Sequence, residues 1–326
     1  MKKTIWAAIL SALVVLGIIF GGGYYCWNLL QPVNSSSTEK IDVLVAKGQT
    51  LSQLSGQLQA QGLIKNADAL RAYAKITRTG DQIKTGLHQL SPSQSVPAII
   101  SALETEPEQV TITILPGWRR EEIAEYLAQM LLSDFDSQRF LDLTATLEGQ
   151  LMPETYKIAP LSTADTIVHI LHRQFVSDVL ENSELKTALE QDGRSLNEIL
   201  TIASLLQREA NQPEQMAVIA GILNNRLADN YPLQLCASAQ YAKGKDPKTG
   251  KWWEPPTLAD TEYDSPYNTY VYKGLPPGPI CSLSLEALQA ALHPTETDYY
   301  YYLHDKQGQI HYAKTLEEHQ VNKAYL

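Results

Sequence analysis

The sequence has few of the residues that build metal sites, disulfide frameworks or nucleic-acid interfaces. Only three of its 326 residues are cysteine and seven are histidine. They do not fall at the spacing of metal ligands, and no glycine-rich phosphate loop occurs, so we expect no metal and no other cofactor. Acidic residues outnumber basic ones by 36 to 26, giving a formal net charge of −10. Because no basic block is present either, nucleic acid is excluded as a partner.

One long uncharged run stands at the amino terminus. Lys2 and Lys3 precede residues 4–30, which are rich in Ile, Leu, Val and Ala and are long enough to cross a bilayer. A cleaved signal peptide is the rival interpretation, but the apolar core is long and no small-x-small cleavage site follows it cleanly. By the positive-inside rule, the cytoplasmic tail is residues 1–3 and everything after the helix lies outside. We therefore expect a single-pass membrane protein with an extracytoplasmic body.

The body is long enough for two domains with cores of their own. Residues 31–40 contain Pro32 and a run of Asn, Ser and Thr, which predicts a flexible linker. Cys236 and Cys281 both fall in the exported part, where a disulfide is chemically allowed. The sequence leaves open whether they pair.

Residues 41–105 predict a small α/β module. An alternating strand over 41–45 is followed by a glycine turn and a helix capped by Thr50. A second helix near 66–76 and a short strand over 87–90 complete it. The strand, turn and helix opening resemble the LysM-like module, and this resemblance implies binding to the glycan chains of cell walls.

Residues 106–326 predict a larger mixed domain, so the expected fold class is α+β. The expected elements are a strand over 110–115, a helix over 119–132, one long helical stretch over 164–188, a helix over 196–209, a helix that begins at Pro213, a hairpin of 299–303 with 309–313, and a last helix capped by Thr315 and Glu318.

The helix over 196–209 carries the strongest chemical signal. Ser195 followed three residues later by Glu198 is a capping box, which marks the start of the helix. Leucine or isoleucine stands three, four and seven residues before Glu209, which places its carboxyl on an apolar face. Desolvation there should raise the pKa of Glu209. A carboxyl that is protonated near neutral pH can donate a proton to a leaving oxygen, as in cleavage of a glycosidic bond.

Glu209 also has a purely structural interpretation. Its carboxylate has Arg208 beside it in the sequence and Arg226 on the next helix, and ion pairs shift carboxyl pKa values as well. The helix alone leaves both interpretations open.

Tyrosine is concentrated toward the carboxyl end, where twelve of the seventeen follow residue 230. Flat amphipathic rings can stack on sugar faces, which suits a sugar-binding groove. For residues 299–302 we prefer an ordinary Tyr-rich strand, since tyrosine is common in sheets. Tyr267 and Tyr270 instead lie in a polar loop before residues 274–280, whose Pro and Gly make a rigid wall for a ligand.

Several separate motifs carry a family resemblance. They are residues 203–209 (ASLLQRE), 224–227 (NNRL), 233–234 (LQ), 267–270 (YNTY) and 274–280 (GLPPGPI). In this order they resemble the endolytic murein transglycosylase family, also called YceG-like or MltG-like. The resemblance covers nearly the whole chain and identifies residues 106–326 as the catalytic domain.

The resemblance implies an activity and a set of site residues. Members cleave nascent peptidoglycan within the strand, beside the membrane, so the implied partners are peptidoglycan glycan strands, the bacterial cytoplasmic (inner) membrane and the cell-wall synthesis machinery. The family's catalytic glutamate falls on Glu209, and Cys236 stands where many members have Asp. The residues implied to orient the sugars are Gln234, Tyr241, Tyr267, Asn268, Thr269 and Tyr270.

A single carboxylate is enough for the implied reaction. A hydrolytic glycosidase normally uses two, about 5 to 9.5 Å apart, whereas a lytic transglycosylase lets the muramic acid's own C6 hydroxyl attack its anomeric carbon and leave a 1,6-anhydro end. Two rivals stay open. A conventional muramidase would add a second carboxylate such as Asp264 or Glu262, and a non-catalytic scaffold would bind the wall without cutting it.

Overall fold

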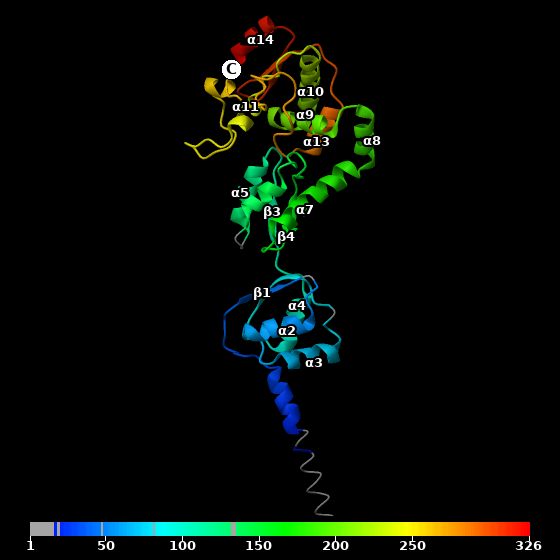
Figure 1. The fold of residues 1–326 in the computed structure, drawn as a ribbon, viewed down its shortest axis with the longest axis vertical. Coiled ribbons are helices and arrows are strands. Elements are labelled where there is room, and N and C mark those ends of the chain that lie inside the picture. Colours follow the sequence, from blue (N-terminus) through cyan, green and yellow to red (C-terminus); the bar gives the residue numbers. More distant parts are fainter. Residues whose placement is uncertain (1–15, 18–19, 47, 81, 132–134) are drawn as a thin grey trace, which may run out of the picture. The chain divides into compact units, whose positions relative to one another are not determined.

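The computed structural model describes residues 16–17, 20–46, 48–80, 82–131 and 135–326. The chain forms two compact units (Figure 1). Unit 1 comprises Met1–Val110 with Lys157–Leu161, and unit 2 comprises Thr111–Tyr156 with Ser162–Leu326. Helices predominate, and the strands of the described residues form three two-stranded sheets. This mixed architecture confirms the expected α+β class.

The amino-terminal segment is described only in part. Residues 20–29 are helical and mostly exposed. The predicted transmembrane helix over 4–30 falls outside the described residues at 4–15 and 18–19, as do Lys2 and Lys3. Among the residues that are described, no helix combines the length and the apolar character needed to cross a membrane.

Unit 1 contains the small α/β module. Its strands β1 (Ile41–Val45) and β2 (Gly86–Leu90) pair antiparallel, with Val43 opposite His88. The helices are α2 (Leu51–Ala60), α3 (Ala67–Thr77) and α4 (Val96–Glu104). The sequence predicted both strands and the first two helices, with the Thr50 capping box, but not α4. The alternation in β1 places Val43 and Val45 in a core with Leu58, Leu70 and Ile99.

From residue 110 onward helices predominate, and the strands are short. The elements are β3 (Val110–Thr113), α5 (Arg120–Met130), α6 (Ser137–Leu143), β4 (Thr155–Ile158), α7 (Ala164–Phe175), a π-helical turn η1 (Val176–Leu180), α8 (Ser183–Asp192), α9 (Leu196–Glu209), α10 (Pro213–Ala228), α11 (Cys236–Lys243), α12 (Leu258–Thr261), α13 (Leu285–Leu292), β5 (Tyr301–His304), β6 (Ile310–Ala313), α14 (Leu316–Asn322) and a 3-10 turn η2 (Lys323–Tyr325).

The prediction of one long helical stretch over 164–188 is wrong in one respect, because the stretch is interrupted at Asn182. After α7 and the π-helical turn the chain leaves helical geometry at Asn182, which has φ −67° and ψ 122°. The Asn182 side chain accepts hydrogen bonds from Glu184 N and Leu185 N and so starts α8 as a new helix. An Asn at an N-cap competes with helix continuation, which the apolar periodicity could not reveal.

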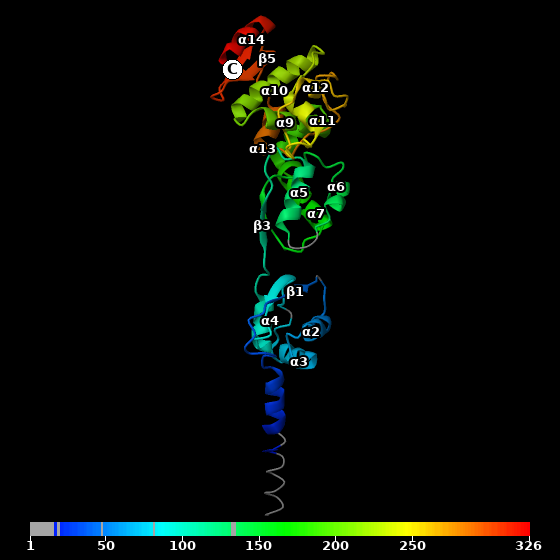
Figure 2. The ribbon, with the colours of Figure 1, turned by 90° about the vertical axis from the view of Figure 1, so that its left-hand side faces the viewer.

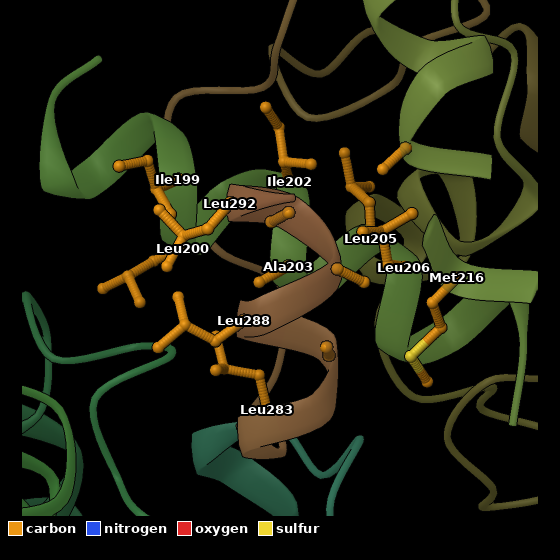
Figure 3. Close-up of a cluster of buried hydrophobic side chains, with 14 of the residues drawn as sticks. Ile199, Leu200, Ile202, Ala203, Leu205, Leu206, Met216, Leu283, Leu288 and Leu292 are labelled. Carbon is orange, nitrogen blue, oxygen red and sulfur yellow. The ribbon is translucent and has the colours of Figure 1, made fainter. Parts of the chain in front are cut away.

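Helix α9 runs through the centre of the unit 2 core. Figure 3 shows its apolar side chains, among them Leu200 and Ala203, facing Leu288 and Leu292 of α13, with Met216 of α10 at one side. All five residues are buried. Because α9 is covered by neighbouring helices over most of its length, its carboxyl end is fixed in place by packing.

The carboxyl-terminal hairpin pairs β5 with β6 antiparallel, and Tyr302 stands opposite Tyr312. Helix α14 packs beside this hairpin (Figure 2). The sequence predicted both the hairpin and a last helix capped by Thr315, whose side chain accepts from Glu318 N. The hairpin brings Tyr302 to the end of α9.

Candidate active site

Glu209 is the last residue of α9, and its position follows from how that helix begins. Ser195 Oγ accepts from Glu198 N at 3.2 Å, and Glu198 Oε2 accepts from Ser195 N at 2.8 Å, which is the predicted capping box. All eight residues from Ile199 to Leu206 are buried. A carboxyl at the end of such a helix is held by a rigid element.

The Glu209 side chain is partly buried and faces a cavity. Its Oε2 accepts a hydrogen bond of 2.8 Å from Tyr302 Oη. Burial raises the pKa of Glu209 above its ordinary value, although that hydrogen bond and the charges of Arg226 and Arg208 act in the opposite direction. The raised pKa agrees with the expectation from the apolar face of the helix.

The two nearby arginines are engaged elsewhere. The guanidinium of Arg208 lies over the Trp253 ring, 4.1 Å from its centroid, and Arg208 Nη1 approaches Gly117 O at 3.4 Å. Arg226 donates to the backbone oxygens of Tyr300 and Leu233. Within the described residues Glu209 therefore forms no ion pair with either arginine, and the purely structural interpretation of this carboxylate finds no support in the geometry.

The cavity beside Glu209 has a volume of about 520 Å³. It gathers residues from the end of α9, from α10, from the segment before α11, from the β5–β6 hairpin and from α14. Among its lining residues Glu209 is the one carboxyl side chain. Three predicted site residues meet here, namely Glu209, Gln234 and Tyr270, and they are joined by Arg226, Tyr231, Cys236, Tyr301, Tyr302, His304, His319 and Lys323.

A larger cavity of about 670 Å³ lies against α10 but has none of the predicted site residues. Its lining includes Gly221, Glu296 and Asp298, and the last of these forms an ion pair of 2.8 Å with Lys314. Volume alone would favour this cavity, but the chemistry favours the one that holds Glu209, because of these two only that one combines a partly buried carboxyl with aromatic and hydrogen-bonding side chains.

Gln234 and Tyr270 approach the cavity from two loops that are bonded to each other. Gln234 has a φ of +50°, a left-handed backbone conformation that residues other than Gly and Asn rarely adopt. Its backbone N donates to Thr269 O at 3.1 Å. Cys236 Sγ lies 3.3 Å from Tyr270 Oη. Cys236 is exposed and Cys281 is buried, and both are free thiols, so the pairing that the sequence left open is not formed.

Asn268 and Thr269 are buried and do not line the Glu209 cavity. Asn268 Nδ2 donates to three backbone oxygens, those of Asp260, Thr261 and Tyr263. Thr269 Oγ1 accepts from Leu235 N at 3.0 Å. These bonds use the polar atoms of both side chains within the protein and hold the loop that carries Tyr270.

Tyr241 and Tyr267 lie together, apart from the lining of the Glu209 cavity. Their ring centroids are 4.8 Å apart. Tyr241 Oη donates to Glu148 Oε2 at 3.3 Å, and the Arg119 guanidinium lies 4.1 Å from the Tyr241 ring centroid. The structure therefore divides the predicted residues between the cavity and this second cluster.

Glu148 is a functional candidate that the sequence did not single out. It is 9% exposed, its Oε1 has no hydrogen-bond partner, and its Oε2 accepts from Arg120 N and Tyr241 Oη. Burial, with a smaller contribution from the charge of Glu121, raises the pKa of Glu148 to about 7.

The sequence also missed Tyr302. Residues 299–302 are four consecutive tyrosines, and the sequence predicts the same ordinary strand for all of them. Only the pairing of β5 with β6 and the packing of this hairpin beside the end of α9 distinguish Tyr302.

Comparison with known families and proteins shows what the chain is similar to. A model of the YceG-like family matches residues 43–325. A relative from Bacillus subtilis (strain 168), named endolytic murein transglycosylase, is 30% identical over 336 residues, covering 94% of this chain and 90% of the relative.

Two further relatives with the same name come from Streptococcus pneumoniae, strains D39 and R6. Each is 28% identical over 98% of this chain. The chain spans 65% of the length of these two relatives. A crystal structure of a YceG-like protein from Listeria monocytogenes superposes with a TM-score of 0.56 at 28% identity, covering 88% of this chain and 100% of that one.

Proposed function

The chain belongs to the YceG-like family, and on that premise we propose that it is a membrane-anchored endolytic lytic transglycosylase of peptidoglycan. It would cleave the bond between N-acetylmuramic acid and N-acetylglucosamine within nascent strands and leave 1,6-anhydro ends. The observation that carries the proposal is Glu209, a desolvated carboxyl at the end of a rigid helix, facing a cavity of about 520 Å³.

In the proposed reaction Glu209 acts first as acid and then as base. It donates its proton to the glycosidic oxygen as the bond from that oxygen to the anomeric carbon breaks. The C6 hydroxyl of the same muramic acid then bonds to that carbon and returns its proton to Glu209. The Tyr302 hydroxyl bonds to Oε2 at 2.8 Å, which leaves Oε1 for the substrate.

The lining of the cavity supports an intramolecular attack over hydrolysis. A muramidase with a second carboxylate would need one within about 5 to 9.5 Å of the first. The candidates named from the sequence were Asp264 and Glu262, and neither lines the cavity. Asp264 is exposed and accepts from Tyr272 Oη at 2.6 Å. With Glu209 as the one carboxyl side chain of the lining, the substrate's own hydroxyl is the available nucleophile.

The remaining residues are assigned to binding and support. Gln234 and Tyr270 line the cavity and would orient the sugars on either side of the scissile bond. Asn268 and Thr269 act by holding their loop. Tyr241 and Tyr267 form an aromatic pair that would contact a strand farther from the cleaved bond.

We also propose where the reaction takes place. The apolar run over 4–30 would anchor the chain in the bacterial cytoplasmic membrane, and the linker over 31–40 would keep the body beside it on the outer side. The LysM-like module over 41–105 would hold the glycan, and the synthesis machinery that produces new strands would supply the substrate.

Analysis of the products tests the proposal. Uncrosslinked glycan strands are incubated with the full-length protein, and the new ends are identified by mass spectrometry. Internal 1,6-anhydro muramic ends are expected. New reducing ends would instead indicate a muramidase, and binding of strands without any new ends would indicate a non-catalytic scaffold.

A further inference from the structure

The Glu209 cavity has a wall rich in cationic groups. Arg226 reaches this wall from α10, His319 from α14, and Lys323 from the turn that follows α14. We call these three residues the cationic wall, after the charges of Arg226 and Lys323. Glu209 is the one carboxyl side chain among the lining residues. Within the described residues neither Arg226 nor Lys323 forms an ion pair with Glu209 or with another carboxyl group.

Arg226 is 7% exposed, yet its side-chain bonds go to neutral groups. It donates to the backbone oxygens of Tyr300 and Leu233, and its guanidinium lies 5.6 and 5.5 Å from the ring centroids of Tyr231 and Tyr301. Buried charges in proteins are usually paired with an opposite charge. Within the described residues Arg226 has no such pair, so its charge acts on whatever occupies the cavity.

His319 adds a hydrogen-bond donor to the same wall. Its ring stacks on Tyr301 with centroids 5.3 Å apart and an interplanar angle of 24°. Its Nδ1 is buried without a hydrogen-bond partner. A neutral imidazole donates through one ring nitrogen and accepts through the other. Burial and the charges of Lys323 and Arg226 lower the pKa of His319, which is consistent with a neutral ring that donates.

Lys323 completes the wall at its exposed side. The structure gives its ammonium group no ion pair and no side-chain hydrogen bond within the described residues, whereas Lys314 and Lys243 each pair with an aspartate. The chain as a whole carries a net charge of −10. A cavity with unpaired cations is therefore a local exception on an acidic protein, and it selects an anionic ligand by charge complementarity.

We propose that the cationic wall is an anion subsite that binds a carboxylate of the peptide substituent on the glycan, so that cleavage favours strands whose peptides are charged. This inference rests on the proposed function, because it takes the substrate to be a glycan with acidic peptides. The carboxylate would lie between Lys323 at the rim and the His319 donor, while Arg226 would add its charge from behind.

The test compares two forms of one substrate. Uncrosslinked strands are used either native or with their peptide carboxylates converted to neutral amides by carbodiimide coupling, so that glycan length and sequence stay the same. For the full-length wild-type protein we expect KM to rise about fivefold on the neutral strands, the effect of one partly exposed ion pair, with little change in kcat. Equal KM values on both forms would overturn the anion subsite.

Two lysine variants locate the effect. Lys323→Gln should show the higher KM already on native strands and no further rise on neutral ones. Lys306→Gln removes the same charge from the exposed turn of the β5–β6 hairpin, outside the cavity lining, and should behave as wild type. A Lys323→Gln protein that still discriminates as wild type does would overturn the role of this wall.

A third substrate separates the two possible sources of the carboxylate. Strands stripped of peptides by an amidase keep a carboxylate only on the lactyl group of the sugar. We expect them to show the higher KM of the neutral strands. A native KM on the stripped strands would overturn the assignment to the peptide.

Binding by the Glu209→Gln protein distinguishes failure of this inference from failure of the proposed function. Co-sedimentation of that variant with native and neutral strands measures the subsite without any cleavage, and tighter binding of native strands is expected. If the wild type cleaves nothing while the variant still prefers native strands, the proposed function fails and the subsite stands. If cleavage occurs and neither protein discriminates, the subsite alone fails.

Discussion

The hydroxyl of Tyr302 donates a hydrogen bond of 2.8 Å to Oε2 of Glu209, joining strand β5 to the end of α9 across 93 residues of sequence. This bond fixes one of the two carboxylate oxygens of Glu209. It also stabilises the charged form of the carboxyl, against the effect of burial. The relationship therefore bears on both the orientation and the pKa of Glu209.

Replacing Tyr302 by Phe tests both effects. Without the hydroxyl the pKa of Glu209 should rise further, so the basic limb of the pH profile of kcat/KM should move to higher pH, because the acid form persists longer. The rate at the optimum should fall roughly 10- to 100-fold through loss of one charge-assisted hydrogen bond.

Tyr300→Phe is the matched control for this variant. The Tyr300 hydroxyl bonds to Asp229 at the surface, so its loss should leave the pH profile unchanged. A Tyr302→Phe protein with the wild-type basic limb would show that the hydroxyl does not influence the ionisation of Glu209.

Glu148 should make the stability of the protein depend on pH. Its pKa is about 7 in the folded protein against 4.5 for an ordinary glutamate, so the folded state binds the proton more tightly than the unfolded state does. The stability that comes from the protonated form is fully present below pH 4.5 and is lost as the pH rises to about 7. The loss should be on the order of 3 kcal/mol in the free energy of unfolding.

Glu148→Gln should remove this dependence. The amide is neutral at every pH and can still accept from Tyr241 and Arg120 N, so the variant should match wild type at pH 5 and melt at a higher temperature at pH 8. Glu154→Gln, at an exposed position, serves as control. Equal melting curves for the Glu148 variant and wild type at pH 8 would refute the assignment of this carboxyl.

Ser195→Ala tests the start of helix α9. The change removes the side-chain acceptor for Glu198 N and should lower the free energy of unfolding by about 1 kcal/mol. Because α9 is held along its length by the core, the cleavage rate well below the melting temperature should stay within about twofold of wild type. Urea unfolding and product release measure the two quantities, and a large loss of rate without loss of stability would contradict this account.

Two glycines in helices should respond in opposite ways to substitution by Ala. A Cβ at Gly221 of α10 would lie 2.0 Å from Thr295 O, whereas at Gly56 of α2 it would meet nothing within 4 Å. Gly221→Ala should therefore destabilise by about 1–3 kcal/mol or more through overpacking, and Gly56→Ala should stabilise by about 0.5–1 kcal/mol. Thermal unfolding of both variants checks the prediction. An unchanged melting temperature for Gly221→Ala would mean that the backbone around Thr295 can move away from the added methyl group at little cost.

Local signals allowed much of the fold to be predicted from the sequence. The start of α9 follows from the capping box at Ser195, and that of α10 from Pro213 at its first position. Strand β1 alternates clearly enough to be found. The sequence did not predict helix α13, although its apolar residues cover α9. The helix is short and follows a Pro- and Gly-rich loop, a composition that predicts turns.

The candidate site could be predicted only in part, because it is assembled from distant segments. Glu209 stands out by its place on an apolar helix, but the chemistry of Tyr302 depends on the β5–β6 hairpin and not on its own sequence context. The division between Tyr270 at the cavity and Tyr267 beside Tyr241 likewise depends on a turn of the chain between them. Alternation or helical spacing cannot show such long-range placement.

The most direct test of the central claim compares the new ends released from uncrosslinked strands by Glu209→Gln and by Glu214→Gln, measured by mass spectrometry beside thermal melts of both proteins. Glu214 lies in the first turn of α10, exposed and outside the Glu209 cavity. We predict that Glu209→Gln melts near wild type and loses 1,6-anhydro ends by at least about 100-fold, while Glu214→Gln retains them. Undiminished 1,6-anhydro ends from a folded Glu209→Gln protein would contradict the account.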